Sequence, residues 1–166
     1  MSASSRTLLL WRHAKSAWND PALADIDRPL ASRGAAAAPR MAVWIGEQWQ
    51  PDRAVCSPAK RTVQTLEYFT AGAAVPVGYD HRIYEAAWAD LLAVVRETPP
   101  SVRTLMLVGH NPGFADLTAA LAGPLPGKFP TAACAALSIV GDWRGLAPGG
   151  ASLAAFQRPK ALPKGY

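Results

Sequence analysis

Three short apolar runs constrain the fold of this chain more than any other feature. They read TLLLWR at residues 7–12, RAVCS at residues 53–57 and RTLMLVGH at residues 103–110. Apolar runs of this length, without an alternating polar pattern, are typical of strands that are covered on both faces. We therefore expect three buried strands with helices packed above and below them.

Helical patterns lie between these runs. In residues 32–50, apolar residues recur at steps of three and four, and Pro39 either kinks that helix or marks its true start. A second helix is expected directly after the second run, with Ser57 as its N-cap and Pro58 at its first position. The remaining expected elements are helices over residues 86–98 and from residue 111 to about 123, a weak strand over 75–80, and strands over 134–140 and 151–156.

The order of these elements predicts the fold class. Strands that alternate with helices indicate an α/β fold, here a three-layer α/β/α arrangement around a mostly parallel central sheet. A length of 166 residues fits a single domain over residues 1–166. The Pro-rich tail from about residue 159 either packs on this domain or is flexible.

Composition limits the partners and the location of the protein. The formal net charge is +5, but the basic residues form no long run, so we expect no nucleic-acid partner. No stretch has the length of a secretory or membrane-spanning apolar segment, which favours a soluble, cytoplasmic protein without a membrane partner. Cys56 and Cys134 lack metal-ligand spacing and are expected to be buried thiols. Nothing in the sequence indicates the oligomeric state.

Polar residues follow each of the three apolar runs. Arg12 and His13 end the first run, Arg61 comes shortly after the second, and His110 ends the third. Ligands of parallel α/β sheets bind beyond the carboxyl ends of the strands, where these residues would meet. We therefore expect two histidines and two arginines in one crevice.

This set of residues fits phosphoryl transfer. The planar guanidinium group matches phosphate oxygens, and a neutral imidazole can attack phosphorus and hold the phosphoryl group covalently. A second histidine can donate to an oxygen as charge shifts in the transition state. The arginines supply the positive charge that magnesium supplies elsewhere, so we expect neither a metal nor a cofactor.

Other interpretations of the same residues remain. Each histidine alone could be a polar residue capping a strand, and each arginine alone could form a surface ion pair. Two histidines could also bind a metal, but neighbouring guanidinium groups would repel a cation. The joint occurrence at three strand ends favours the phosphate site.

The chain resembles the histidine phosphatase superfamily, which includes the cofactor-dependent phosphoglycerate mutases. Residues 12–19, RHAKSAWN, resemble the mutase stretch RHGxSxWN, with Ala14 in place of the motif glycine. Residues 56–65, CSPAKRTVQT, resemble the family segment SPxxRxxxT, and residues 107–113, LVGHNPG, resemble the segment of the second histidine. The order and spacing of these motifs make the resemblance specific.

The resemblance implies a role for each residue of the expected crevice. It makes His13 the nucleophile that accepts the phosphoryl group. It makes Arg12 and Arg61 ligands of the phosphoryl oxygens, and His110 the residue that completes the pocket. It also implies a phosphoglycerate mutase-like fold.

Three further residues are weaker candidates. By resemblance, Ser16 and Asn19 would bind substrate from the loop after the first strand. Glu85 stands where many family members carry an acidic proton donor, although it can equally be an ordinary carboxylate near a helix N-terminus. Asp90 is a weaker candidate for the same role.

The short spacing between the motifs points to one branch of the family. Only 23 residues separate Arg61 from Glu85, and 24 separate Glu85 from His110, so the insertions are minimal and little chain is left for a lid. The segments DIDRPLASRG, residues 25–34, and FPTAACAALSI, residues 129–139, resemble SixA-like phosphohistidine phosphatases. An open site suits a phosphorylated side chain of another protein.

The sequence therefore predicts a metal-independent phosphatase that works through a phosphohistidine intermediate. The expected substrate is phosphohistidine on a protein such as a phosphotransfer domain. Two alternatives stay open: a phosphatase of a small phosphorylated metabolite, and a non-catalytic module that binds phosphate. A mutase is disfavoured because re-orienting an intermediate requires an enclosed site.

Overall fold

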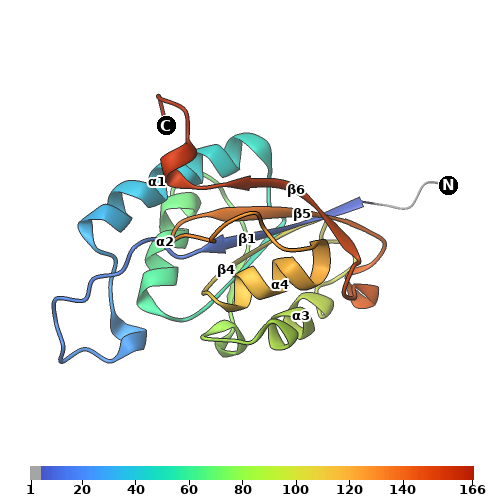
Figure 1. The fold of residues 1–166 in the computed structure, drawn as a ribbon, viewed down its shortest axis with the longest axis horizontal. Helices are drawn as coiled ribbons and strands as arrows, with labels where there is room; N and C mark the ends of the chain where they lie inside the picture. Colours follow the sequence, from blue (N-terminus) through green and yellow to red (C-terminus); the bar gives the residue numbers. More distant parts are fainter. Residues whose placement is uncertain (1–4) are drawn as a thin grey trace.

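A computed structural model describes residues 5–166 as six strands in one sheet, with helices on both faces (Figure 1). The strands follow the order β3-β2-β4-β1-β5-β6 across the sheet. Their bounds are β1 (Ser5–Arg12), β2 (Arg53–Cys56), β3 (Val77–Tyr79), β4 (Thr104–Gly109), β5 (Cys134–Val140) and β6 (Ala151–Gln157). All the expected strands are therefore present.

The sheet is mostly parallel, which confirms the prediction. β1 pairs in parallel with β4, β4 with β2, and β2 with β3. β5 runs antiparallel to both β1 and β6. The carboxyl ends of β2, β4 and β1 consequently lie side by side, at the left of the molecule in Figure 1.

The helices form the outer two of three layers. They are α1 (Ser32–Gln48), α2 (Lys60–Thr70), α3 (Trp88–Arg96) and α4 (Gly113–Ala122), with short 3₁₀ turns η1 (Asp25–Asp27), η2 (His81–Ile83), η3 (Trp143–Gly145) and η4 (Pro159–Ala161). Leu9 and Trp11 of β1 pack with α1 and α2, while Leu8 and Leu10 pack with α3 and α4. This alternation confirms the three-layer α/β/α arrangement. Within residues 5–166, no helix is long and apolar enough to cross a membrane.

The start of α2 differs from the prediction. The helix begins at Lys60 with Ala59 as its N-cap, so Ser57 is not the cap and Pro58 is not in the first turn. The chain stays extended after β2, because the Ser57 N–H still donates to the main-chain oxygen of Val108 at 3.0 Å. The Ser57 hydroxyl thereby remains available to the site at the strand end.

The structure also decides between the two alternatives for Pro39 and corrects the bounds of α3. Pro39 lies inside α1, which starts at Ser32, so it does not mark the beginning of that helix. α3 covers Trp88–Arg96 and is shorter than the expected 86–98. Its late start follows from the backbone at Ala87, the N-cap, whose ψ of 158° is extended and not helical.

The chain after β6 packs on α1. Leu162 is buried in the core beneath α1 and α2. The Arg40 Nε in α1 donates to the main-chain oxygen of Tyr166 at 2.9 Å. Of the two possibilities for this tail, the structure shows the packed one.

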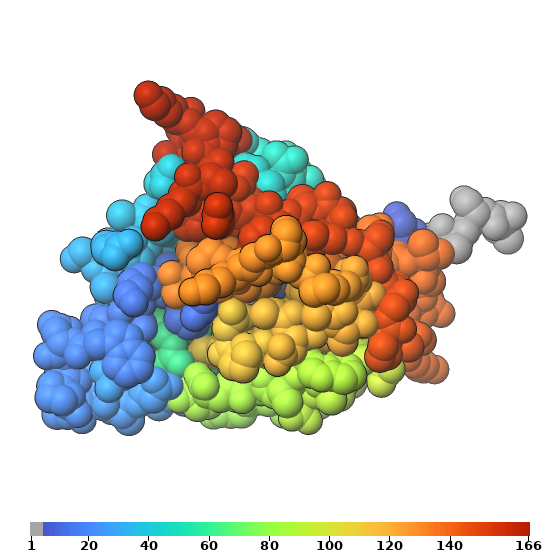
Figure 2. Space-filling model, in the orientation of Figure 1, coloured from blue at the N-terminus to red at the C-terminus, as the bar shows by residue number. Residues whose placement is uncertain are grey.

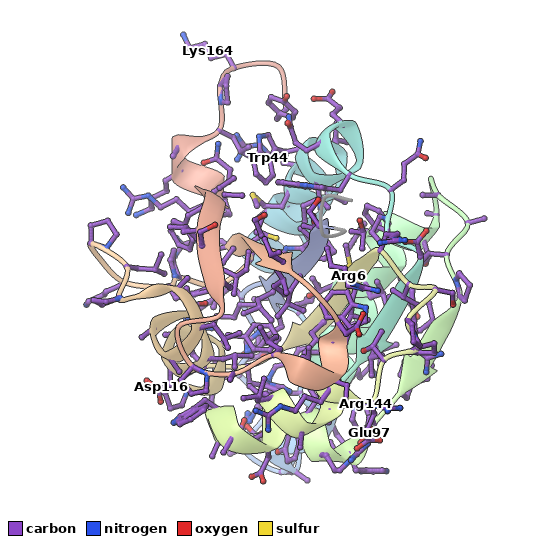
Figure 3. The ribbon with its side chains drawn as sticks, turned by 90° about the vertical axis from the view of Figure 1, so that its right-hand side faces the viewer. Arg6, Trp44, Glu97, Asp116, Arg144 and Lys164 are labelled. Carbon is purple, nitrogen blue, oxygen red and sulfur yellow. The ribbon has the colours of Figure 1, made fainter. Side chains whose placement is uncertain are left out.

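At the amino end of β1, a buried arginine holds neighbouring loops in place. Arg6, labelled in Figure 3, begins β1 and is buried, and it donates to the main-chain oxygens of Pro100 and Gly141. These bonds tie the loops before β4 and after β5 to the start of β1. Although Arg6 and Arg12 are close in sequence, they lie at opposite ends of one strand and do not form one cationic face.

Candidate active site

The ends of three neighbouring strands form the floor of the site. The His13 N–H donates to the main-chain oxygen of Gly109 at 3.0 Å, which continues the pairing of β1 with β4. His110 follows β4 directly, and Ser57 follows β2. In Figure 2 the dark blue atoms at the end of β1 lie between the blue lobe of residues 14–31, here called the first loop, and the yellow atoms of α4.

The structure brings the two predicted histidines and two predicted arginines together. The rings of His13 and His110 lie 5.3 Å apart between centroids, and Arg61 Nη2 lies 3.4 Å from His110 Nδ1. Arg12 Nη1 donates to the main-chain oxygen of Phe129 at 2.7 Å, which fixes the guanidinium group. Burial and the nearby charge of Arg61 lower the pKa of Arg12, so the two cations share one site.

The hydrogen bonding of His13 leaves one of its ring nitrogens free. Its Nδ1 lies 2.7 Å from the main-chain oxygen of Ala14, and because a carbonyl only accepts, Nδ1 carries the hydrogen and Nε2 is left unprotonated. Burial, assisted by the positive charges of Arg61 and Arg12, lowers the pKa of His13 to about 4. The ring is therefore neutral at neutral pH, with a free electron pair on Nε2.

His110 is held by groups on both ring nitrogens. Its Nε2 lies 2.7 Å from the Ser57 hydroxyl, and Arg61 points a donor at Nδ1. Because arginine only donates, Nδ1 accepts and Nε2 donates to Ser57. Burial lowers the pKa of His110 to about 3, and the charge that His13 carries when protonated adds to this effect.

Glu85 lies at the mouth of the site. Its Oε1 is 3.1 Å from Arg61 Nη2 and 3.8 Å from His110 Nδ1, and about half of its side chain is exposed. Its backbone adopts a φ of 51°, a left-handed conformation that costs energy in a residue other than glycine. The structure therefore places a carboxylate where a proton donor would stand, whereas Asp90 is exposed on the first turn of α3 without a contact to these groups.

Ser16 and Asn19 form no hydrogen bond to the side chains of the two histidines and two arginines within residues 5–166. Ser16 is buried and forms a bridge with Leu30 across the first loop. Asn19 is exposed farther along that loop. Their role as substrate ligands stays a prediction.

The alanine that replaces the motif glycine fits its position. Ala14 is buried, its backbone is not left-handed, and its N–H donates to Thr65 Oγ1 at 3.0 Å. The close approach in this loop occurs instead at Gly34, where a Cβ would lie 2.2 Å from the main-chain oxygen of Lys15. The position that requires a residue without a side chain is therefore Gly34 in α1, and not Ala14.

Sequence reasoning assigned no role to Asp25 and Tyr84, and it assigned Ser57 only the role of a helix cap, but all three contact the site. Asp25 Oδ2 accepts from Arg61 Nη2 at 3.0 Å and from the Tyr84 hydroxyl. The ring of Tyr84 stands edge-on to His110 at 5.4 Å, and Ser57 contacts the same histidine. Asp25 lies in the segment with SixA-like resemblance, which was the only signal for it.

The described residues do not gather into a metal site. Within residues 5–166, no group of three or more histidine, cysteine or acidic side chains could hold a metal ion. Cys56 and Cys134 are both free and buried, and burial raises the pKa of Cys56 to about 12. The positive charge next to His13 comes from arginines.

Because His13 and His110 are buried, we expect the protein to lose stability in acid. Their folded-state pKa values, about 4 for His13 and about 3 for His110, lie below the ordinary 6.5. Between pH 6.5 and these values the unfolded chain binds protons that the folded chain does not, so the free energy of unfolding falls as the pH falls. We expect a loss on the order of 3 kcal/mol for one such histidine, and no effect of these groups above pH 6.5.

Denaturant unfolding at a series of pH values measures this loss. The variant His110→Asn removes one of the two groups and should show a shallower decrease than the wild type. His81→Asn, which changes an exposed histidine, should follow the wild type. An identical decrease in wild type and His110→Asn would contradict the assignment of the effect to the site.

Comparisons with known proteins agree with this geometry. The sequence model described as Histidine phosphatase superfamily (branch 1) matches residues 8–101. The chain is 36% identical over 160 residues to the uncharacterized protein Rv1276c of Mycobacterium tuberculosis, an alignment that covers 90% of this chain and 99% of that protein.

Comparison with solved structures also finds histidine phosphatases. A candidate phosphohistidine phosphatase SixA from Nakamurella multipartitia has a TM-score of 0.85 and 32% identity, and the match covers 97% of this chain and all of the other. The protein histidine phosphatase SixA complexed with tungstate has a TM-score of 0.76 and 25% identity, with 95% and 99% of the two chains covered. The chain belongs to the histidine phosphatase superfamily, with a phosphoglycerate mutase-like fold, and is a phosphatase.

Proposed function

We propose that this protein removes the phosphoryl group from phosphohistidine on another protein, through a phosphohistidine intermediate of its own. The observation that carries the proposal is the neutral ring of His13, which has an unprotonated Nε2 and lies beside His110, with the charges of Arg61 and Arg12 nearby. A nucleophile beside fixed positive charges is what phosphoryl transfer requires.

The first chemical step transfers the phosphoryl group to the protein. His13 Nε2 attacks phosphorus, the bond between phosphorus and the substrate nitrogen breaks, and the leaving imidazole takes a proton. Arg12 and Arg61 stabilise the charge on the phosphoryl oxygens. A bound phosphoryl dianion favours protonation of His110, whose Nδ1 then donates toward the site.

The second step releases phosphate. Water attacks the phosphorus bound to His13, the bond to Nε2 breaks, and His13 returns to its neutral form. Glu85, with its oxygen 3.1 Å from Arg61 Nη2, is the carboxylate that takes the proton from this water. Once its carboxylate has taken up a proton from solvent, the same residue gives this proton to the leaving group in the first step.

The proposed substrate rests on the short chain between the site residues and on the relatives. Between α2 and α4 the chain forms only β3, η2, α3 and β4, all of them part of the sheet or its covering layers. No segment among these is left over as a separate lid, which favours a substrate that a folded protein presents. The similarity to SixA structures described as phosphohistidine phosphatases supports this substrate class.

A comparison of substrates tests the proposal. We expect kcat/KM for a phosphohistidine-containing phosphotransfer domain to exceed that for a panel of phosphorylated metabolites by orders of magnitude. The reverse order would replace the proposal by a metabolite phosphatase. A stable, acid-labile phosphoryl adduct without turnover on any substrate would indicate a phosphate-binding module.

The proposed mechanism also predicts insensitivity to metal chelation. Because Arg12 and Arg61 provide the charge compensation, we expect EDTA to leave kcat/KM nearly unchanged. The measurement compares dialysed protein with and without EDTA, and with added magnesium. Strong inhibition by EDTA that magnesium reverses would contradict the proposed role of the arginines.

A further inference from the structure

We infer that Asp25 is a positioning residue that holds Arg61 in place, and that Glu85 is the carboxylate that gives up its contact with Arg61 when a phosphoryl group binds. The inference rests on the proposed function and assigns different roles to the two acids that contact the same guanidinium group. It starts from the number of acceptors around Arg61.

Arg61 Nη2 has more acceptors than hydrogens. Asp25 Oδ2 lies at 3.0 Å, Glu85 Oε1 at 3.1 Å and His110 Nδ1 at 3.4 Å, whereas Nη2 carries two hydrogens. A phosphoryl oxygen that binds between Arg61 and His110 needs a hydrogen of Nη2, because Nη2 is the nitrogen of Arg61 that faces His110. At least one present acceptor must therefore withdraw when the anion binds.

Asp25 is the acceptor that is attached most firmly. Two different atoms of this residue receive bonds from Arg61, because its main-chain oxygen accepts from Nη1 at 2.8 Å and its Oδ2 accepts from Nη2. Two-point attachment fixes the plane of the guanidinium group. Oδ2 also accepts from Tyr84, and this bond, followed by those from Arg61, lowers the pKa of Asp25.

Glu85 is attached by one atom. Its Oε1 contacts Arg61 and approaches His110 Nδ1 at 3.8 Å, and no other side-chain hydrogen bond holds its carboxylate among residues 5–166. The side chain is 52% exposed, so it can rotate into solvent without leaving a buried charge. Displacement by a phosphoryl oxygen moves this carboxylate away from Arg61 and frees it for the leaving group or the attacking water.

These unequal attachments predict opposite effects of removing the two charges. Asp25→Ala removes the carboxylate bond and leaves Arg61 with only the main-chain bond to residue 25, so we expect weaker binding of inorganic phosphate and at least a ten-fold lower kcat/KM. Glu85→Gln removes the negative charge that competes with the anion, so we expect phosphate to bind several-fold more tightly than to the wild type. Asp27→Ala is the matched control, because Asp27 is exposed in the same 3₁₀ turn and its side chain makes no ion pair within residues 5–166.

The experiment measures the dissociation constant of inorganic phosphate by calorimetry, together with kcat and KM, for these variants and for Arg61→Ala. If Asp25 acts through Arg61, Asp25→Ala has no further effect on phosphate affinity in the Arg61→Ala background. A merely structural role would lower affinity equally in both backgrounds and would overturn the inference. Thermal unfolding checks that each variant is folded, and Asp25→Asn provides a second, milder variant.

The outcomes separate this inference from the proposed function. Opposite shifts of phosphate affinity in Asp25→Ala and Glu85→Gln support the inference even if the wild type hydrolyses no phosphohistidine. Unchanged phosphate affinity in Asp25→Ala, or weaker binding in Glu85→Gln, overturns it even if the wild type is an active phosphohistidine phosphatase. Failure of the wild type to bind phosphate overturns both.

Discussion

Replacing His13 by alanine is expected to lower kcat/KM by about 10⁴-fold or more, the order of magnitude that loss of a catalytic nucleophile costs in enzymes with covalent intermediates. The expectation rests on Nε2 of His13, which is left unprotonated because Nδ1 bonds to the Ala14 carbonyl. The variant should also form no covalent phosphoryl adduct. Steady-state kinetics and rapid quenching measure both quantities.

The chain provides a natural control for this variant. It contains three histidines, and His81 lies exposed in η2, outside the group formed by His13 and His110. His81→Ala should therefore keep wild-type kinetics. Ordinary turnover by His13→Ala would reject the assignment of the nucleophile.

Replacing Arg61 by alanine is the second change with a large expected effect. We expect kcat/KM to fall by about 10³- to 10⁵-fold, the range measured for arginines that stabilise phosphoryl transfer. This corresponds to roughly 4–7 kcal/mol of transition-state stabilisation. Arg61 has this importance because its buried guanidinium group is fixed by Asp25 and lies 3.4 Å from His110.

Two further variants test the reason for this effect. Arg61→Lys keeps the charge but loses the planar fork, so it should recover only a small part of the lost activity. Arg82→Ala removes an exposed arginine that pairs with Asp80 and Glu97, and it should leave kcat/KM unchanged. If Arg61→Lys were fully active, the geometry of the fork would not matter and the argument from bidentate binding would be wrong.

The layers and the convergence of the site were predictable because they depend on regular features of the sequence. Buried strands show as apolar runs, and the residue after each run marks a strand end. Parallel pairing of β2, β4 and β1 then brings Arg61, His110 and His13 together without any knowledge of loops. The prediction required only that the strands be neighbours in the sheet.

The contacts of Asp25, Tyr84 and Ser57 were not predictable in the same way. Asp25 reaches Arg61 from 36 positions away through the path of an irregular loop, which no periodicity encodes. Ser57 was predicted to cap α2 because it precedes Pro58, a local preference of helix starts. The structure uses its hydroxyl for His110 instead, a choice that depends on the neighbouring strand.

The most direct test of the account is the chemical identity of the phosphorylated intermediate. Wild-type protein quenched during turnover of a phosphohistidine substrate should carry an acid-labile phosphoryl group on His13. ³¹P NMR and peptide mapping should place that group on Nε2, because Nδ1 is occupied by its bond to Ala14. A phosphoryl group on Nδ1 or on another residue, or rapid turnover without any covalent intermediate, would contradict the account.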